Sequence, residues 1–81
     1  MQVNVRLSGE LARMSGTPRV AIELADGATV ADARIALLTR LPELSGALDA
    51  SLPLIRGSHV GAHHGLRHGD ELALLLPAAG G

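Results

Sequence analysis

Residues 72–81, with the sequence LALLLPAAGG, decide how the rest of the chain must be arranged. The first five of them form a short apolar run that is typical of a buried strand. Pro77 then lacks a backbone donor and stops further pairing along a sheet. After it come only side chains with a methyl group or none. The pattern predicts a central strand followed by an extended, flexible tail over residues 77–81.

The two glycines at the end of this tail, Gly80 and Gly81, make it slender. Glycine has no Cβ, so the walls of another protein can close tightly around its backbone. Such a tail suits a chain whose terminal carboxylate must reach into the active site of a partner. The alternative is an ordinary frayed terminus, because last residues are often small and disordered.

The composition narrows the class of protein. The chain has 81 residues, a formal net charge of −1 and no aromatic residue, so it lacks the basic surface and the stacking side chains of a nucleic-acid binder. It has no cysteine, which excludes disulfides, thiolate metal sites and a thiol nucleophile. It has neither an apolar run long enough for a bilayer nor a signal peptide. We expect one cytoplasmic domain over residues 1–81 with an aliphatic core.

Two stretches near the N-terminus alternate polar and apolar residues, which is the period of a half-buried strand. They are residues 2–8 (QVNVRLS) and 19–24 (RVAIEL). Because they are close in sequence, we expect them to pair as an antiparallel hairpin. The segment between them, residues 9–16 (GELARMSG), fits a single helical turn or a wide loop.

One amphipathic helix is predicted over residues 30–41. Thr29 is a candidate N-cap with Asp32 three residues later, the spacing of a capping box. Apolar residues then recur at helical spacing until Pro42, where a helix should end. The next ten residues, 42–51 (PELSGALDAS), predict a short helical turn whose leucines pack under the sheet.

The remaining residues predict a strand at 52–57 and a short strand and loop at 58–68. Pro53 places the first of these strands at an edge, or itself at the strand's entrance. The first and last strands of the chain are the most apolar, so they should lie side by side and parallel in the sheet centre. The expected fold is α+β, a mixed sheet of about five strands with one main helix on one face, which is the β-grasp (ubiquitin-like) arrangement.

Several segments, taken in order, resemble the MoaD/ThiS family of ubiquitin-like sulfur carriers. They are VRL (5–7), ELAR (10–13), GATVAD (27–32), GDELALL (69–75) and PAAGG (77–81). The segment at 42–51 makes the chain more similar to the small subunit of molybdopterin synthase than to the thiamine carriers. The chain departs from the family pattern at Ser8, Arg56 and Leu76, where an aromatic residue, an asparagine and a proline are common.

The resemblance implies a chemical role for Gly81. In this family a ubiquitin-activating-type adenylyltransferase uses Mg-ATP to convert the terminal carboxylate into an acyl-adenylate, and a persulfide sulfur then displaces AMP to leave a thiocarboxylate. In the molybdopterin version the tail inserts into the large subunit of the synthase and donates its sulfur. The chain would bind no cofactor and would not be catalytic alone, because the ATP site belongs to its partner.

The candidate site therefore follows the end of the chain. Gly81 is the reacting residue and Gly80 allows passage of the tail. The partner-binding candidates are Ala73, Leu75, Leu76, Pro77, Ala78 and Ala79. Ala73 and Leu75 alternate with inward-pointing leucines, so we expect them to form a small apolar docking face, although ordinary exposed aliphatic residues are an equal alternative.

Four histidines, His59, His63, His64 and His68, lie within ten residues and suggest a metal site. Interspersed glycines argue against a helix there, so we expect solvated loop histidines and no metal. Two further functions would use the same tail. The chain could be a sulfur carrier for thiamine, tRNA thiolation or another pathway, or it could be a ubiquitin-like modifier or binding module.

Overall fold

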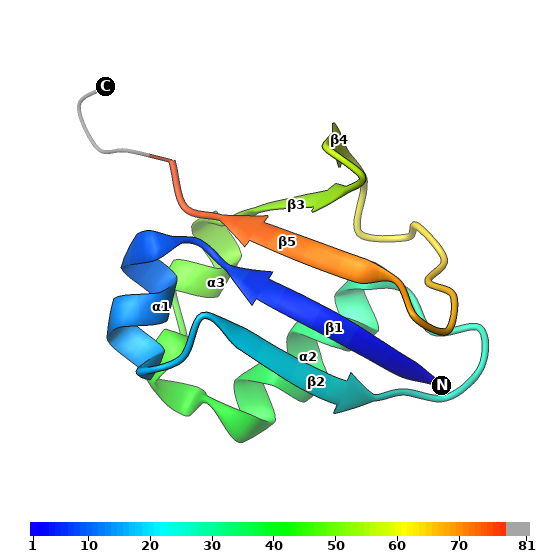
Figure 1. The fold of residues 1–81 in the computed structure, drawn as a ribbon, viewed down its shortest axis with the longest axis horizontal. Coiled ribbons are helices and arrows are strands. Elements are labelled where there is room, and N and C mark those ends of the chain that lie inside the picture. The colour runs from blue at the N-terminus through cyan, green and yellow to red at the C-terminus, as the bar shows by residue number, and fades with distance from the viewer. Residues whose placement is uncertain (78–81) are drawn as a thin grey trace.

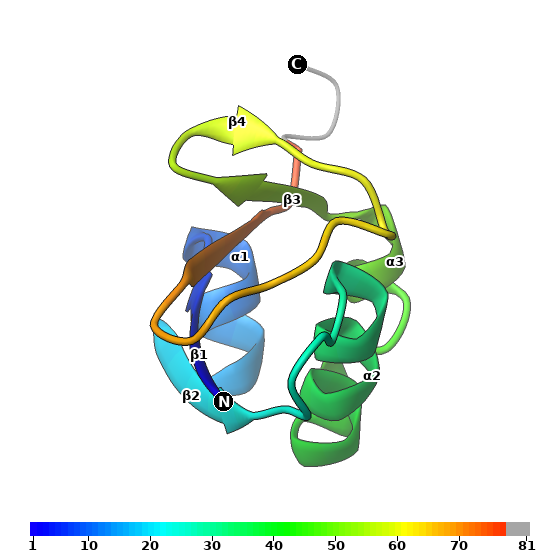
Figure 2. The same cartoon turned by 90° about the vertical axis from the view of Figure 1, so that its right-hand side faces the viewer.

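A computed structural model shows a five-stranded mixed sheet with helices on one face (Figure 1). The structure describes residues 1–77. The strand order is β2-β1-β5-β3-β4, and Figure 2 shows the helices on the same side of the sheet. This arrangement confirms the predicted β-grasp fold. In chain order the elements are β1 (Gln2–Leu7), α1 (Gly9–Ser15), β2 (Arg19–Glu23), α2 (Val30–Arg40), the 3₁₀ helix η1 (Pro42–Leu44), α3 (Ala47–Ala50), β3 (Leu52–Ile55), β4 (Ser58–His59) and β5 (Glu71–Leu75).

Both predicted pairings of β1 are present. It pairs antiparallel with β2, with Val5 opposite Val20, and parallel with β5, with Val5 opposite Leu72. On its other side β5 pairs antiparallel with β3. The last strand of the described chain therefore occupies the centre of the sheet.

The inward-facing residues of the strands form an aliphatic core against α1, α2 and the segment after α2. Strict alternation in β1 buries every second side chain, as its sequence predicts. Leu72 and Leu74 of β5 are fully buried. The members of the core cluster are Val3, Val5, Leu7, Leu11, Ile22, Val30, Ala33, Leu37, Leu44, Leu48, Ile55, Leu66, Leu72 and Leu74.

Helix α2 begins at the predicted capping box. The Thr29 N–H donates to Asp32 Oδ2 at 2.9 Å, and Thr29 Oγ1 accepts from the Asp32 N–H at 3.4 Å. The helix ends at Arg40, just before Pro42, because the residue preceding a proline is biased away from helical geometry. Leu38 lies at the flank of the buried stripe and is 36% exposed. Within residues 1–77 no helix is long and apolar enough to cross a bilayer.

Helix α1 is longer than the predicted single turn or loop, with seven residues. Gly16 ends it in the left-handed region (φ 79°), where its N–H donates to the Ala12 carbonyl. Leu11 is fully buried and fixes the helix to the core. Burial of Leu11 and the left-handed geometry of Gly16 stabilise a helix longer than the single turn that the sequence predicts.

One side chain of α2 anchors the segment between α2 and β3 through hydrogen bonds to its backbone. Arg34 donates to the Leu48 carbonyl at 2.7 Å and to the Ser51 carbonyl at 2.9 Å. Leu44 and Leu48 are buried, as predicted for this segment. These contacts fix where β3 begins and thus which of its residues lie beside β5.

Strand β3 carries its proline at the second position, the entrance that the sequence predicts. The Pro53 carbonyl accepts from the Val60 N–H at 3.0 Å, on the side away from β5. In an antiparallel pair the N–H of a residue points to the same side as its carbonyl, so the missing N–H of Pro53 leaves the ladder to β5 intact. The short β4 forms the edge of the sheet.

Candidate functional site

Strand β5 places the first two predicted docking residues on the sheet face that carries no helix, here called the outer face. Leu75 is 39% exposed, whereas Ala73 is only 8% exposed. Ala73 lies between Arg6 of β1 and Leu54 of β3 in the sheet register. Its methyl group is covered because both neighbours are larger. Most of the exposed apolar area at this point must therefore come from residues other than Ala73.

Strand β3 adds exposed apolar side chains next to Ala73 and Leu75. Leu52 is opposite Leu75, and Leu54 is opposite Ala73. Leu52 is 43% exposed and Leu54 is half-buried. The residues Leu52, Leu54, Ala73 and Leu75 thus form a two-by-two apolar cluster on the outer face, here called the outer patch. Cross-strand neighbours in an antiparallel pair lie about 4.5–5.5 Å apart at their Cβ atoms, so the patch is contiguous.

An open groove of about 590 Å³ runs along the patch. Its apolar lining includes Leu54 and Leu75, and its polar lining includes Arg6, Arg56 and Glu71. An apolar centre with a charged border is the usual composition of a protein–protein contact surface. The geometry favours a partner that places an apolar side chain against the leucines.

The charges at this border are partly neutralised within the chain. Glu71 lies 3.8 Å from the Arg6 guanidinium and accepts a hydrogen bond from Arg19 at 3.2 Å. All three side chains are about half exposed or more. Pairs of this kind contribute little to stability, about 0–1 kcal/mol. Because these ion pairs are weak, the side chains of Arg6, Arg19 and Glu71 can pair with charges of a docked protein at little cost.

The origin of the tail is fixed next to the outer patch. After β5 ends at Leu75, the Leu76 N–H donates to Ser8 Oγ at 3.1 Å, and Leu76 packs against the core. The Ser8 N–H in turn donates to the Leu74 carbonyl at 3.0 Å. Pro77 follows and is exposed. The predicted site residues Ala78, Ala79, Gly80 and Gly81 lie outside the described residues.

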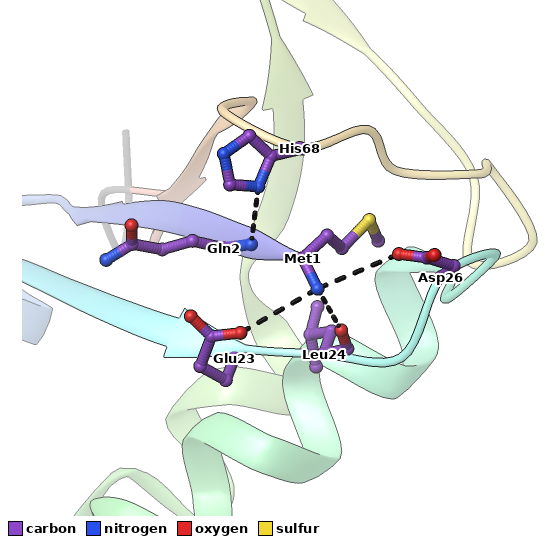
Figure 3. A network of polar contacts seen from close by, with 6 residues as sticks. All are labelled: Met1, Gln2, Glu23, Leu24, Asp26 and His68. Carbon is purple, nitrogen blue, oxygen red and sulfur yellow. Dashed lines mark hydrogen bonds and ion pairs between the residues drawn. The ribbon is translucent and has the colours of Figure 1, made fainter.

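The histidines do not gather into a site. Among residues 1–77 no group of three or more His, Asp or Glu side chains could hold a metal ion. His59 and His63 are exposed. His68 has a structural contact, shown in Figure 3: its Nδ1 accepts from the Gln2 N–H at 3.0 Å.

The contact of His68 belongs to a network that secures the start of β5. The Gln2 carbonyl accepts from the Gly69 N–H at 2.8 Å, so both backbone groups of Gln2 hold the loop before β5. In the same view the Met1 ammonium donates to the Leu24 carbonyl at 2.6 Å and ties β1 to the end of β2. The two contacts of Gln2 keep β5 in register with β1 and therefore help to fix the position of the outer patch.

Sequence reasoning missed Leu52, Leu54 and Ser8. The two leucines lie in a predicted strand, but which of its residues face outward depends on its register with β5. The alternation around Pro53 was the signal that could have placed them on the face opposite Ile55. No local signal marks the contact of Ser8 with Leu76, since they are 68 residues apart.

Together, fold and site define a class: a β-grasp domain with an apolar patch on its open sheet face, next to the point where the chain leaves β5 at Leu76. A model of the ThiS family matches residues 5–81. The chain therefore belongs to the ThiS family of ubiquitin-like sulfur carriers. No curated protein matches it.

Solved structures from several organisms share this fold. SAMP1 of Haloferax volcanii is 29% identical with a TM-score of 0.92, and the match covers 100% of both chains. The small archaeal modifier protein 1 of Methanosarcina acetivorans is 26% identical with a TM-score of 0.80, covering 99% of this chain and 96% of that one. A complex of subunits 1 and 2 of the molybdopterin-converting factor from Helicobacter pylori includes a chain that is 23% identical, with a TM-score of 0.72 and full coverage of both chains.

Proposed function

We propose that this chain is a sulfur carrier whose Gly81 carboxylate is adenylated and converted to a thiocarboxylate. It donates that sulfur in molybdopterin biosynthesis, as the small subunit of a molybdopterin synthase. Membership of the ThiS family supports the carrier role. The segment at 42–51, which forms η1 and α3, supports the molybdopterin assignment through its resemblance to that small subunit.

One observation carries the proposal: the outer patch lies directly beside the fixed origin of the tail. Leu75 belongs to the patch and Leu76 is held by Ser8. A partner that binds the patch therefore receives the tail at a defined place. Four residues separate Pro77 from the carboxylate, and an extended chain of that length reaches about 13–14 Å. That reach sets the largest distance at which the reaction centre of a partner can lie from Pro77.

The chemistry requires activation because a carboxylate repels a sulfur nucleophile. An oxygen of the Gly81 carboxylate attacks the α-phosphate of Mg-ATP, and pyrophosphate leaves. A persulfide sulfur then attacks the acyl carbon, the bond to AMP breaks, and a thiol cleaves the S–S bond to release the thiocarboxylate. A ubiquitin-activating-type adenylyltransferase supplies the ATP site and the persulfide, and the synthase large subunit receives the sulfur.

The test is intact-mass spectrometry of the full chain after incubation with the adenylyltransferase of the same genome, Mg-ATP and a sulfur donor. The wild type should gain the mass difference of one oxygen exchanged for sulfur, localised to the C-terminal peptide. A variant with one alanine added after Gly81 should gain nothing, because an ordinary peptide bond replaces the reacting acid. Equal modification of the extended chain would contradict the proposal.

A second candidate function is protein modification through the same carboxylate. Its support is the identity to the two archaeal modifier proteins, which exceeds that to the H. pylori subunit. In that case Gly81 should appear in isopeptide bonds to lysines of other proteins. Peptide mass spectrometry of extracts that contain the tagged chain separates the two, because a modifier leaves a C-terminal remnant on target lysines and a sulfur carrier does not.

A further inference from the structure

Ser8 stands where β1 turns into α1, and its hydroxyl is used in an unusual way. It occupies the N-cap position of α1, where a serine oxygen normally accepts from an N–H of the first helical turn. Within the described part of the chain its side chain makes no such capping bond. The Oγ instead accepts from the Leu76 N–H, which belongs to the other end of the chain. The Ser8 hydroxyl thus stabilises the backbone at Leu76 instead of the first turn of α1.

The bond occurs at the last place where the backbone before the tail can be held. Leu76 follows the final residue of β5, and Pro77 has no N–H to donate. The Leu76 N–H is therefore the last backbone donor before residues 78–81. Proline also restricts the backbone of the residue before it. One hydroxyl at this point thus limits the direction in which the chain leaves the sheet.

Two backbone hydrogen bonds hold Ser8 in place, so that its hydroxyl can fix the position of Leu76. Its own N–H donates to the Leu74 carbonyl and continues the parallel ladder of β1 and β5 by one step. Its carbonyl accepts from the Ala12 N–H at 2.7 Å. The N–H and the carbonyl of Ser8 therefore both form hydrogen bonds. Figure 1 shows the end of β5 beside the start of α1, where these bonds are made.

We propose that Ser8 is a positioning residue for the activation of Gly81. By holding Leu76 it restricts the tail to directions in which the carboxylate enters the active site of a partner bound to the outer patch. This inference rests on the proposed function. Without the bond, only a fraction of docked molecules would present the tail correctly, and the apparent activity would fall to that fraction of the wild-type value.

The first measurement needs no partner. Amide hydrogen exchange by NMR on the full chain should show a protected Leu76 N–H in the wild type. Ser8→Ala should lose this protection, while Ser8→Thr, which keeps a hydroxyl, should retain it. Protection of Leu76 that is equal in the wild type and in Ser8→Ala would overturn the inference, whatever the activity of the two chains.

The second measurement is the rate of pyrophosphate release with the adenylyltransferase and Mg-ATP. Ser8→Ala should lower kcat/KM about three- to tenfold, the effect of one hydrogen bond, and Ser8→Thr should restore it. Calorimetric affinity for the adenylyltransferase without nucleotide should stay at the wild-type value, because the outer patch is intact. A loss of affinity equal to the loss of kcat/KM would overturn the positioning role.

Ser15→Ala is the matched control. Ser15 lies at the other end of α1, and its hydroxyl donates to the Leu11 carbonyl at 2.9 Å. This variant loses a hydrogen bond of the same helix but should activate as the wild type does. An equal loss in Ser15→Ala would assign the effect to stability and overturn the inference. If the wild type is adenylated and Ser8→Ala is equally active, the role of Ser8 is overturned but the proposed function is not. If the wild type is never adenylated, both the proposed function and this inference are overturned.

Discussion

Leu72 and Leu75 are three positions apart on β5 and serve different purposes. Leu72 is fully buried between the sheet and the helices, while Leu75 is 39% exposed on the outer face. Because side chains of a strand point alternately to its two faces, this one short strand contributes both to the core and to the outer patch.

The first prediction uses this contrast. Leu72→Ala should lower the free energy of unfolding by about 2–5 kcal/mol, because it leaves a cavity in the core. Urea denaturation followed by circular dichroism measures it. Leu75→Ala is the control and should cost far less, since much of its side chain already contacts water. Equal costs would mean that the two faces of β5 are assigned the wrong way round.

The second prediction concerns Arg56 in the turn between β3 and β4. Arg56 and Gly57 have φ of 50° and 78°, the left-handed geometry of a two-residue hairpin turn that favours Asn-Gly. Arg56→Asn should raise the free energy of unfolding by about 1 kcal/mol, because asparagine tolerates this region better. Arg56→Ala, which removes the same side chain without that tolerance, should bring no gain. Thermal denaturation of both variants decides between relief of strain and loss of charge.

At the scale of elements, β3 and β5 act as a pair. The outer patch exists because Leu52 is opposite Leu75 and Leu54 is opposite Ala73. Shifting either strand by one residue would turn the leucines inward. The contacts of Arg34 with the segment before β3 therefore help to form the outer patch, although Arg34 is on the other side of the sheet.

The third prediction tests the patch. Leu75→Glu should weaken binding to the synthase large subunit and to the adenylyltransferase by tenfold or more, because it buries an unpaired charge in an apolar contact. Calorimetry measures it, with circular dichroism to show that the fold is kept. Leu38→Glu is the matched control, since Leu38 is similarly exposed at 36% but belongs to α2. Undiminished binding of Leu75→Glu would remove Leu75 from the site.

Local patterns were sufficient to predict most of these elements. Alternation identified β1 and β2, a short apolar run identified β5, and the Thr29–Asp32 spacing located the start of α2. The outer patch could not be predicted in full, because Leu52 joins it only through register with a strand about twenty residues further along the chain. The length of α1 was also missed, since Leu11 stabilises it by burial against distant residues. Properties that arise from long-range pairing leave no mark in a short window of sequence.

At the scale of the whole molecule, stability and reactivity belong to separate parts of the chain. The core cluster and the residues packed on it run from Met1 to Leu76, whereas the reacting group is proposed at Gly81. A change in the tail should therefore alter sulfur transfer without altering the melting temperature.

The fourth prediction follows from this separation. Gly80→Val should slow thiocarboxylate formation at least tenfold and leave the melting temperature unchanged, because β-branched bulk next to the carboxylate obstructs its entry. Gly61→Val is the control, since a Cβ at this exposed loop position meets nothing within 4 Å. Intact-mass time courses and differential scanning calorimetry give the two readouts. A lowered melting temperature for Gly80→Val would show that the tail also supports the fold.

The parallel pairing of β1 with β5 also has a consequence for folding kinetics. The two central strands come from opposite ends of the chain, and contacts between distant residues form late because the loop between them must close first. The β1–β2 and β3–β4 pairs can form locally, but neither is joined to the other until β5 is inserted between them. Ser8 can hold Leu76 only after that step. A chain that has not finished folding has neither an outer patch nor a fixed tail origin. If the chain is activated as proposed, only completely folded molecules should therefore be adenylated.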